Sequence, residues 1–320
     1  MSNRKYWISA AALVALLVAV PVVTYSIDAI FALTFATRIL ILAAVAVSLN
    51  LILGYGGLLS MCHATFVGVG AYVVGVGSYH AFNDGMDWMA NGFLQIVVTL
   101  VVSGIVAAII GGISLRTRGI YFLMITMAFS QTLYLAAVGA YEYGGDEGMT
   151  IFQPSVFAGF EFKGRYVMYA AAAVFFCLSV LVVDRLTKSR FGLVFQATRM
   201  NEARVRALGY DPVRIRLVAF VISGVMAGLA GFLLANNAEF VSPVDLHWVR
   251  SADLVIMVVL GGLGLGLGPL FGAAFLLIVE EMASGITPHW PIVVGVLVLL
   301  VAMFMPRGLG GLLPNEKRHD

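Results

Sequence analysis

RLTKSRFGLVFQATRMNEARVRALGYDPVRIR, residues 185–216, is the stretch that decides how the rest of the chain is arranged. It holds eight of the 19 Lys and Arg residues, in a tenth of the length of the chain. Apolar segments of membrane-spanning length lie on both sides of it. Because Lys and Arg accumulate in loops that remain in the cytoplasm, residues 185–216 are predicted to form a large cytosolic loop.

The composition places the chain in a lipid bilayer. Of its 320 residues, 61% are hydrophobic and 11% are charged, against roughly 25% charged in an average soluble domain. The mean hydropathy is +0.98. The two cysteines, Cys62 and Cys177, lie inside apolar segments and show no metal or disulfide spacing, so both are expected to be buried thiols.

The apolar windows predict an all-α, polytopic membrane protein, a single transmembrane domain over residues 1–320. A spanning helix needs about 20 mostly apolar residues. Arg4 and Lys5 followed by an apolar run imitate a signal peptide, but no convincing cleavage site follows, so a retained first span is expected. Ten spans with both termini in the cytoplasm are predicted: Trp7–Ile27, Phe31–Leu53, Cys62–Tyr79, Phe93–Ile113, Ile120–Ala140, Val167–Val183, Leu217–Ala235, Leu254–Leu260, Leu270–Val279 and Ile292–Met305.

Two glycine-rich breaks leave the span count open between eight and ten. Gly54–Gly57 and Gly261–Gly268 interrupt apolar runs, and residues 54–61 and 254–279 are either full crossings or re-entrant segments. Paired short helices of this kind are associated with transport pathways. Gly224 and Gly228 form a GxxxG pair that predicts close helix packing.

Sequence patterns for catalysis are missing from the chain. Thr187-Lys188-Ser189 lacks both glycines of a phosphate-binding loop, and no GxSxG elbow is present. The five histidines have no metal-ligand spacing. The chain is therefore expected not to be an enzyme and to bind neither metal nor cofactor itself. The chain is expected to contact membrane lipid and to have no nucleic-acid partner.

Within the basic loop, the sequence of residues 201–212 predicts a short helix. Gly209 would cap its C-terminus, and Pro212 would prevent it from continuing. Its polar and apolar residues are mixed, which suits a helix on the membrane surface or in a groove of a soluble partner. The alternative is a solvated loop that only anchors the topology.

Glu202-Ala203, followed by Gly209, resembles the EAA loop of ABC-importer permeases, the element that seats in the ATPase subunits. The surrounding residues 191–235 are similar to the branched-chain amino-acid permease family, and so are residues 49–72, 116–131 and 259–275. Permeases for urea and short-chain amides share these motifs, so the resemblance leaves the substrate open.

The resemblance implies a permease subunit of an ABC importer in the bacterial inner membrane that imports branched-chain or related amino acids. Its partners would be a second permease, two ATPase subunits that carry ATP and Mg²⁺, and an extracytoplasmic binding protein. Arg204 and Arg206 would pair with acids on the ATPase. The residues expected to couple the chain to the ATPase are Arg199, Glu202, Ala203, Arg204, Arg206, Gly209 and Tyr210.

Polar residues inside apolar spans are the candidates for the translocation pathway, since unpaired polar groups in lipid cost several kcal/mol. They lie beside the Gly54–Gly57 break and along the fifth predicted span: Asn50, Tyr55, Ser60, His63, Thr126, Ser130 and Gln131. A histidine packed at a helix end is the plainer interpretation of His63. Arg38 is expected to extend toward the outer interface, and Glu280 and Glu281 to be solvated.

One segment departs from the family pattern. Where these permeases often carry a TGGSDGL-like external segment, this chain has Tyr143-Gly144-Gly145-Asp146-Glu147-Gly148-Met149. The alternative function is a stand-alone secondary transporter or channel driven by an ion gradient. It predicts acids at one depth within the spans, whereas the acids here fall almost entirely in loops or at span ends.

Overall fold

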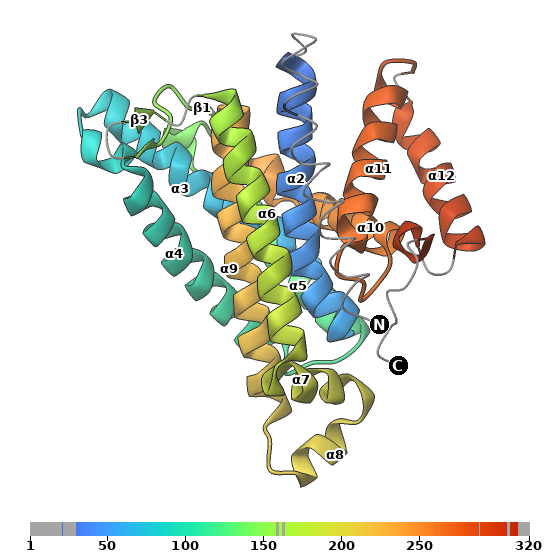
Figure 1. Cartoon of the computed structure of the whole chain (residues 1–320). Coiled ribbons are helices and arrows are strands. Elements are labelled where there is room, and N and C mark those ends of the chain that lie inside the picture. The colour runs from blue at the N-terminus through green and yellow to red at the C-terminus, as the bar shows by residue number, and fades with distance from the viewer. Residues whose placement is uncertain are drawn as a thin grey trace.

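Two long and largely buried helices, α2 (Ile30–Asn50) and α9 (Pro212–Ala238), form the centre of the fold. The computed structural model describes residues 21, 30–157, 160–161, 164–287, 289–305 and 308–312. In Figure 1, α2, α6 and α9 run side by side through the middle of the molecule. The predicted span Trp7–Ile27 lies, apart from Pro21, outside the described residues.

Five of the described helices are long and apolar enough to cross a membrane. They are α2 with its continuation to Tyr55, α4 (Gly92–Ser114), α5 (Ile120–Val138), α6 (Arg165–Lys188) and α9. The polytopic all-α prediction is therefore confirmed at this level. The count of ten spans and the assignment of sides stay predictions.

The remaining described helices are shorter or more polar. They are α3 (His63–Asn83), α7 (Arg190–Met200), α8 (Glu202–Ala207), α10 (Trp248–Gly261), α11 (Gly268–Ser284) and α12 (Trp290–Phe304). Helix α10 has 14 residues and α11 has 17, so each is about 20–25 Å long, less than the ~30 Å hydrocarbon core. Residues 254–279 thus form a hairpin of two short helices, as the glycine break indicated.

Several short elements complete the described chain. Two-residue strands pair antiparallel as β1 (Met149–Thr150) with β4 (Phe240–Val241), and β2 (Val156–Phe157) with β3 (Phe160–Glu161). The turns of π- or 3-10 helix are η1 (Leu51–Tyr55), η2 (Asp87–Ala90), η3 (Tyr141–Tyr143), η4 (Pro243–Leu246) and η5 (Leu309–Leu312).

The basic segment 185–216 is mostly helical, and the short helix expected inside it is α8. Helix α6 continues to Lys188, where it was expected to end near Val183, and α9 begins at Pro212 instead of Leu217. Asp211 explains the early start of α9, because its carboxylate accepts hydrogen bonds from the amides of Val213 and Arg214. The apolar pattern alone could not show these capped, charged helix ends.

Central packing depends on small residues of α9. A side chain at Gly224 would lie 2.7 Å from Cβ of Ala107 on α4, and one at Gly228 would collide with Ser103 on the same helix. The predicted close packing of the GxxxG pair is confirmed. Helix α3 also packs against α9, where Gly70 meets the backbone carbonyl of Gly228.

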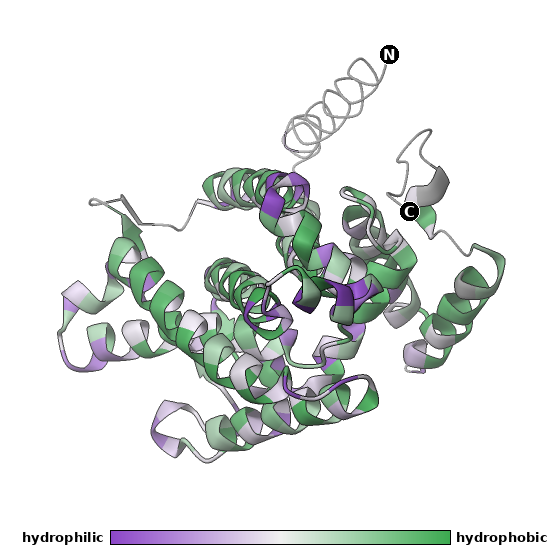
Figure 2. Cartoon of the chain, turned by 90° about the horizontal axis from the view of Figure 1, so that it is seen from below, coloured by the Kyte–Doolittle hydropathy of each residue, from purple (hydrophilic) through white to green (hydrophobic). Residues whose placement is uncertain are grey.

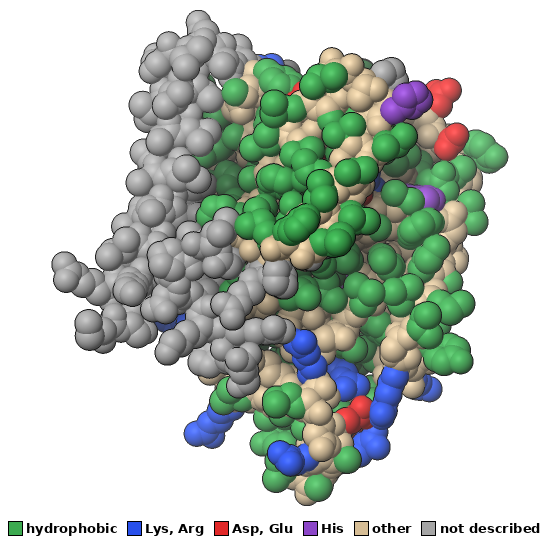
Figure 3. Space-filling view, turned by 90° about the vertical axis from the view of Figure 1, so that its right-hand side faces the viewer, with side chains coloured by type: hydrophobic (Ala, Val, Ile, Leu, Met, Phe, Trp, Pro, Cys, Tyr) green, Lys and Arg blue, Asp and Glu red, His purple; other side chains and the backbone are tan. Residues whose placement is uncertain are grey.

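The outer surface is apolar, as a bilayer requires. Hydrophobic residues cover much of the long helices in Figure 2, and hydrophilic ones concentrate at helix ends, in connections and in the short helices. On α4, every fourth residue from Val97 to Ile113 leaves more than half of its side chain exposed. In Figure 3 the Lys and Arg side chains gather at the lower end, below a broad hydrophobic surface. This charge separation fits a chain whose basic end lies in water.

Candidate functional site

Helices α7 and α8 project from the basic end of the molecule, below the apolar bundle (Figure 1). Ser189 caps α7 by accepting a hydrogen bond from the amide of Gly192, and Asn201 caps α8 by accepting one from the amide of Arg204. Beyond α8, the amide of Gly209 donates to Arg206 O and the amide of Tyr210 donates to Val205 O. These two bonds form a Schellman motif, and Gly209 has the positive φ of 87° that it requires, so the predicted closing role of Gly209 is confirmed.

The carboxylate of Glu202 ties α8 to the bundle. It accepts hydrogen bonds from Arg118 in the α4–α5 connection at 2.8 Å, from Arg206 at 2.8 Å and from Arg216 on α9 at 3.3 Å. The side chains of Glu202 and Arg216 are only 12% and 10% exposed. Arg216 also donates to the carbonyl and hydroxyl oxygens of Thr198 on α7. One carboxylate therefore joins α8, α9 and the α4–α5 connection.

Exposed apolar side chains flank α8 on both sides, at Met200, the last residue of α7, and at Leu208 and Tyr210, which follow α8. Met200 is 82% exposed, Leu208 70% and Tyr210 51%, whereas Val205 is buried beneath the helix. Ala203 and Arg204 are also exposed, and Arg204 makes no ion pair with another described residue. Met200 and Leu208 were missed in the sequence, because nothing in a short helix separates an outward from an inward apolar residue.

Arg199 points from α7 toward α2. Its Nη1 donates a hydrogen bond of 2.6 Å to the carbonyl oxygen of Gly54, in the π-helical turn that ends the α2 helix. Gly57 follows with φ of 65°, and a side chain there would lie 3.0 Å from Arg199. The predicted Gly54–Gly57 break is thus a π-helical turn and an unwound segment, with an arginine of the basic end bound to it.

Asn50 connects this turn to the hairpin of α10 and α11. Its side-chain Nδ2 donates to Leu265 O, and its Oδ1 accepts from the amide of Gly264, both at 2.9 Å. Asn50 is 1% exposed. The two glycine-broken segments that the sequence singled out are therefore joined by one amide side chain.

His63 is held in a closed set of hydrogen bonds at the start of α3. Its Nε2 lies 2.7 Å from the hydroxyl of Ser223, and that hydroxyl donates to Ser48 O at 2.6 Å. Since the single hydroxyl proton of Ser223 is used there, Nε2 of His63 carries the proton and donates, and Nδ1 accepts from Ser60 at 3.2 Å. Ser60 also contacts Cys62 at 3.3 Å, and both Cys62 and Cys177 are free thiols. The contacts of His63 match the plainer, structural interpretation.

The other predicted pathway residues lie at contacts between further segments of the chain or against the apolar core. Thr126 accepts a hydrogen bond from the amide of Met61 at 3.2 Å, and Ser130 donates to Leu246 O at 2.8 Å. Gln131 is half-buried, and its Oε1 has no partner among the described residues. Tyr55 packs against the apolar core. The structure thus groups Ser60 with His63, and places Asn50, Thr126 and Ser130 at separate contacts. Their role in transport stays a prediction.

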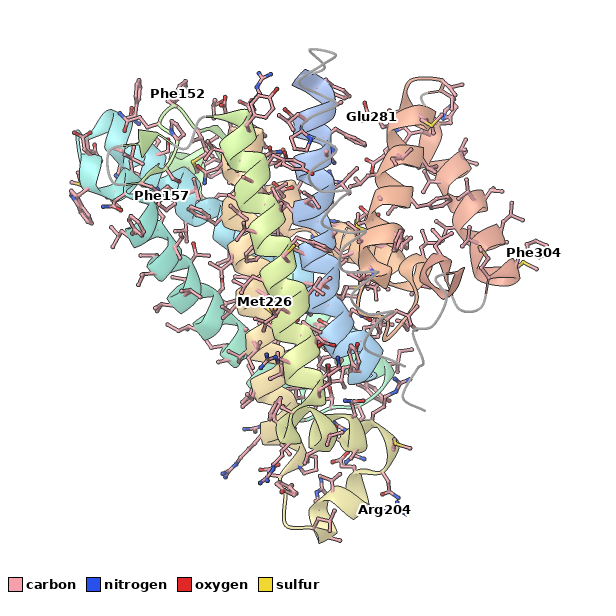
Figure 4. All side chains as sticks on the ribbon, viewed as in Figure 1. Phe152, Phe157, Arg204, Met226, Glu281 and Phe304 are labelled. Carbon is pink, nitrogen blue, oxygen red and sulfur yellow. The ribbon has the colours of Figure 1, made fainter. Side chains whose placement is uncertain are left out.

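A cavity of about 670 Å³ lies among α2, α3, α9, η4 and the α10–α11 hairpin. Apolar side chains of these elements form much of its wall. Six charged residues of both signs also line it: Arg38, Asp245, Arg250, Asp253, Glu280 and Glu281. Figure 4 places Glu281 at the end of the molecule opposite Arg204 of α8.

The charges of this cavity are close enough to act on one another. Arg250 Nη1 lies 3.8 Å from Asp253 Oδ2. Burial in η4 raises the pKa of Asp245, and the positive charges of Arg250 and Arg38 oppose that rise. These residues come from four separate segments, so the sequence showed only isolated charges at span ends. Within the described residues, no cluster of three His, Cys, Asp or Glu side chains is arranged to hold a metal ion.

Comparisons with known proteins identify the family to which the sequence is similar. Residues 31–304 match the family model described as branched-chain amino acid transport system / permease component. The high-affinity branched-chain amino acid transport system permease proteins LivM of Salmonella typhimurium LT2 and of Escherichia coli K12 are each 29% identical, over 86% of this chain and 68% of theirs. A probable LivM of Methanocaldococcus jannaschii is 26% identical over 83% of this chain and 89% of its own. No solved structure matches the chain.

Proposed function

The chain belongs to the family of permease components of branched-chain amino acid transport systems, and from this premise we propose that its α7–α8 segment docks the ATPase subunits that drive import. It is the permease component of an ABC transport system and not its catalytic subunit. The further members of the complex, namely a second permease, two ATPases with ATP and Mg²⁺, and an extracytoplasmic binding protein, are part of the proposal, as is a place in the bacterial inner membrane with α8 in the cytosol.

The observation that carries the docking proposal is the set of exposed apolar side chains that flank the capped, basic helix α8. Met200, Leu208 and Tyr210 are exposed at the end of the molecule where Lys and Arg gather, and so face water instead of lipid. Exposed apolar groups rimmed by polar ones mark sites of protein interaction. Because Glu202 ties α8 to α9 and to the α4–α5 connection, a displacement of α8 moves these elements with it.

The proposed motion also has a route to the other end of the molecule. Arg199 on α7 is bound to Gly54 O, and Asn50 at the same turn is bound to the loop between α10 and α11. The α10–α11 hairpin forms one wall of the charged cavity. Closure of the ATPase dimer around ATP would thus shift the wall of that cavity through rigid, hydrogen-bonded elements.

Replacement of Leu208 by Glu tests the docking. Ile286, between α11 and α12 at the opposite end, is 83% exposed and supplies the matched control, Ile286→Glu. Leu208→Glu should abolish co-purification of the ATPase and ATP-dependent leucine uptake, whereas Ile286→Glu should retain the ATPase. Full ATPase retention by Leu208→Glu would refute the docking surface, and ion-driven uptake by the isolated chain would favour a secondary transporter.

A further inference from the structure

The charged cavity has a composition that matches a small zwitterion with an apolar side chain. Its volume of about 670 Å³ is within the usual range of ligand pockets, roughly 300–1,000 Å³. Two arginines and four carboxylates face a space whose remaining wall includes Phe35, Leu42, Val67 and Met257. An amino acid carries a carboxylate and an ammonium group and can contact both signs of this wall, whereas a purely anionic or cationic ligand can contact only one.

Arg38 is the cation best placed to bind a carboxylate. It lies on the cavity wall, half-buried, and makes no ion pair with another described residue. Arg250, by contrast, lies 3.8 Å from Asp253. A planar guanidinium binds a carboxylate through two parallel hydrogen bonds, and apolar surroundings strengthen such charge-assisted bonds.

Glu280 and Asp253 supply the negative charge of the site. Both line the cavity, and they are close enough for the charge of Glu280 to act on Asp253. Neighbouring carboxylates repel each other, and a cation near both relieves that repulsion. An ammonium group on the ligand has this effect.

We propose that this cavity binds the imported amino acid as a zwitterion, with Arg38 on its carboxylate, Glu280 and Asp253 around its ammonium group, and its side chain against Leu42 and Met257. The assignment rests on the proposed function, because it makes the cavity the place where the permease receives its substrate. It adds the residues that select for both charges of the substrate. Glu281 on the cavity wall lies at the end of the molecule opposite Arg204 of α8 (Figure 4), the end at which an external binding protein would release its ligand.

The test measures binding of L-leucine and of L-leucinamide, which lacks the carboxylate, to the purified permease–ATPase complex without binding protein. Arg38→Gln should weaken leucine binding about 10- to 100-fold, the usual effect of losing a hydrogen bond to a charged group, and leave leucinamide binding unchanged. Arg38→Lys should restore part of the loss. Arg165→Gln, an exposed arginine at the start of α6 that does not line the cavity, should bind both ligands as the wild type does.

The preference for leucine over leucinamide is the deciding readout, since a general structural defect weakens both ligands alike. Three outcomes would each overturn the assignment. Arg38→Gln could bind leucine as tightly as Arg165→Gln does, or it could bind leucine and leucinamide more weakly by the same factor. The third outcome is that the wild type binds no leucine. In a parallel experiment, we would measure ATP-dependent leucine uptake by the same wild-type complex together with its binding protein. If that uptake fails, the proposed function fails; if it proceeds and the preference is unchanged, only the assignment of Arg38 fails.

Discussion

Replacing Glu202 by Gln should release α8 from the bundle without unfolding the chain. The carboxylate holds Arg118 and Arg206, whose side chains are 67% and 60% exposed, and Arg216, which is 10% exposed. Each exposed pair contributes about 0.2–1 kcal/mol. Loss of one partner from a buried pair costs about 3–5 kcal/mol, because the remaining charge stays buried. Thr198 still accepts from Arg216, so the lower part of that range is expected.

A loss of about 3 kcal/mol corresponds to an increase of about 10²-fold in the local opening of α8. Hydrogen–deuterium exchange by mass spectrometry, followed on peptides that cover residues 201–210, measures that opening directly. Exchange in α4 and α9 should change little. The double variant Glu202→Gln/Arg216→Met should recover most of the protection, since no buried charge remains unpaired.

Arg214→Gln is the matched control for this experiment. Arg214 pairs with Asp211 at 3.1 Å at the same end of the molecule, but its side chain is 86% exposed. Its loss should change exchange less than about fivefold, in line with a surface ion pair. If Glu202→Gln exchanges at the wild-type rate, or if Arg214→Gln has an equal effect, the buried Glu202–Arg216 pair does not hold α8.

Three further changes test the interior. Gly70→Ala places a methyl group against a backbone carbonyl of α9 and should lower the thermal stability of the complex, by about 1–3 kcal/mol, whereas Gly112→Ala, which meets nothing within 4 Å, should not. Ser223→Ala leaves two buried groups without a partner and should cost about 1–3 kcal/mol in a denaturation assay, against almost nothing for the exposed Thr132→Ala. Asn50→Ala should uncouple the complex, so that ATP hydrolysis continues while leucine uptake per ATP falls severalfold; unchanged stoichiometry would exclude Asn50 from the route.

The sequence predicted those elements whose limits are marked by local chemistry. Helix α4 was expected over Phe93–Ile113 and runs from Gly92 to Ser114, because an apolar window ends at polar residues on both sides. The short helix of the basic segment was expected to close at Gly209, because few other residues adopt positive φ. In both cases the signal lies within a few residues along the chain.

The candidate site was less accessible from the sequence, because its contacts join distant segments. Arg206 was expected to pair with an acid of the ATPase, and it already donates to Glu202 four residues before it. Arg38 was expected to extend toward the outer interface, and this stays a prediction; the sequence did not show that Arg38 shares a cavity with Asp245, on a segment about two hundred residues later. Only the tertiary packing of α2 against the α10–α11 hairpin brings these charges together.

Helix α10 connects the Asn50 contact with the charged cavity. The loop that follows its last residue is bound to Asn50, whereas Arg250 and Asp253 near its first residue face the cavity. A 14-residue helix is about 20 Å long and moves as a rigid rod, so a small tilt imposed at the Asn50 end displaces the charges at the other end. A site that holds a zwitterion between α2 and the hairpin would lose complementarity when that spacing changes, because hydrogen bonds need donor–acceptor distances of about 2.7–3.2 Å and nearly linear angles. In the proposed mechanism, release of the substrate needs no separate gate, because the displacement that an ATPase would impose on α8 would also move Arg250 and Asp253 relative to Arg38.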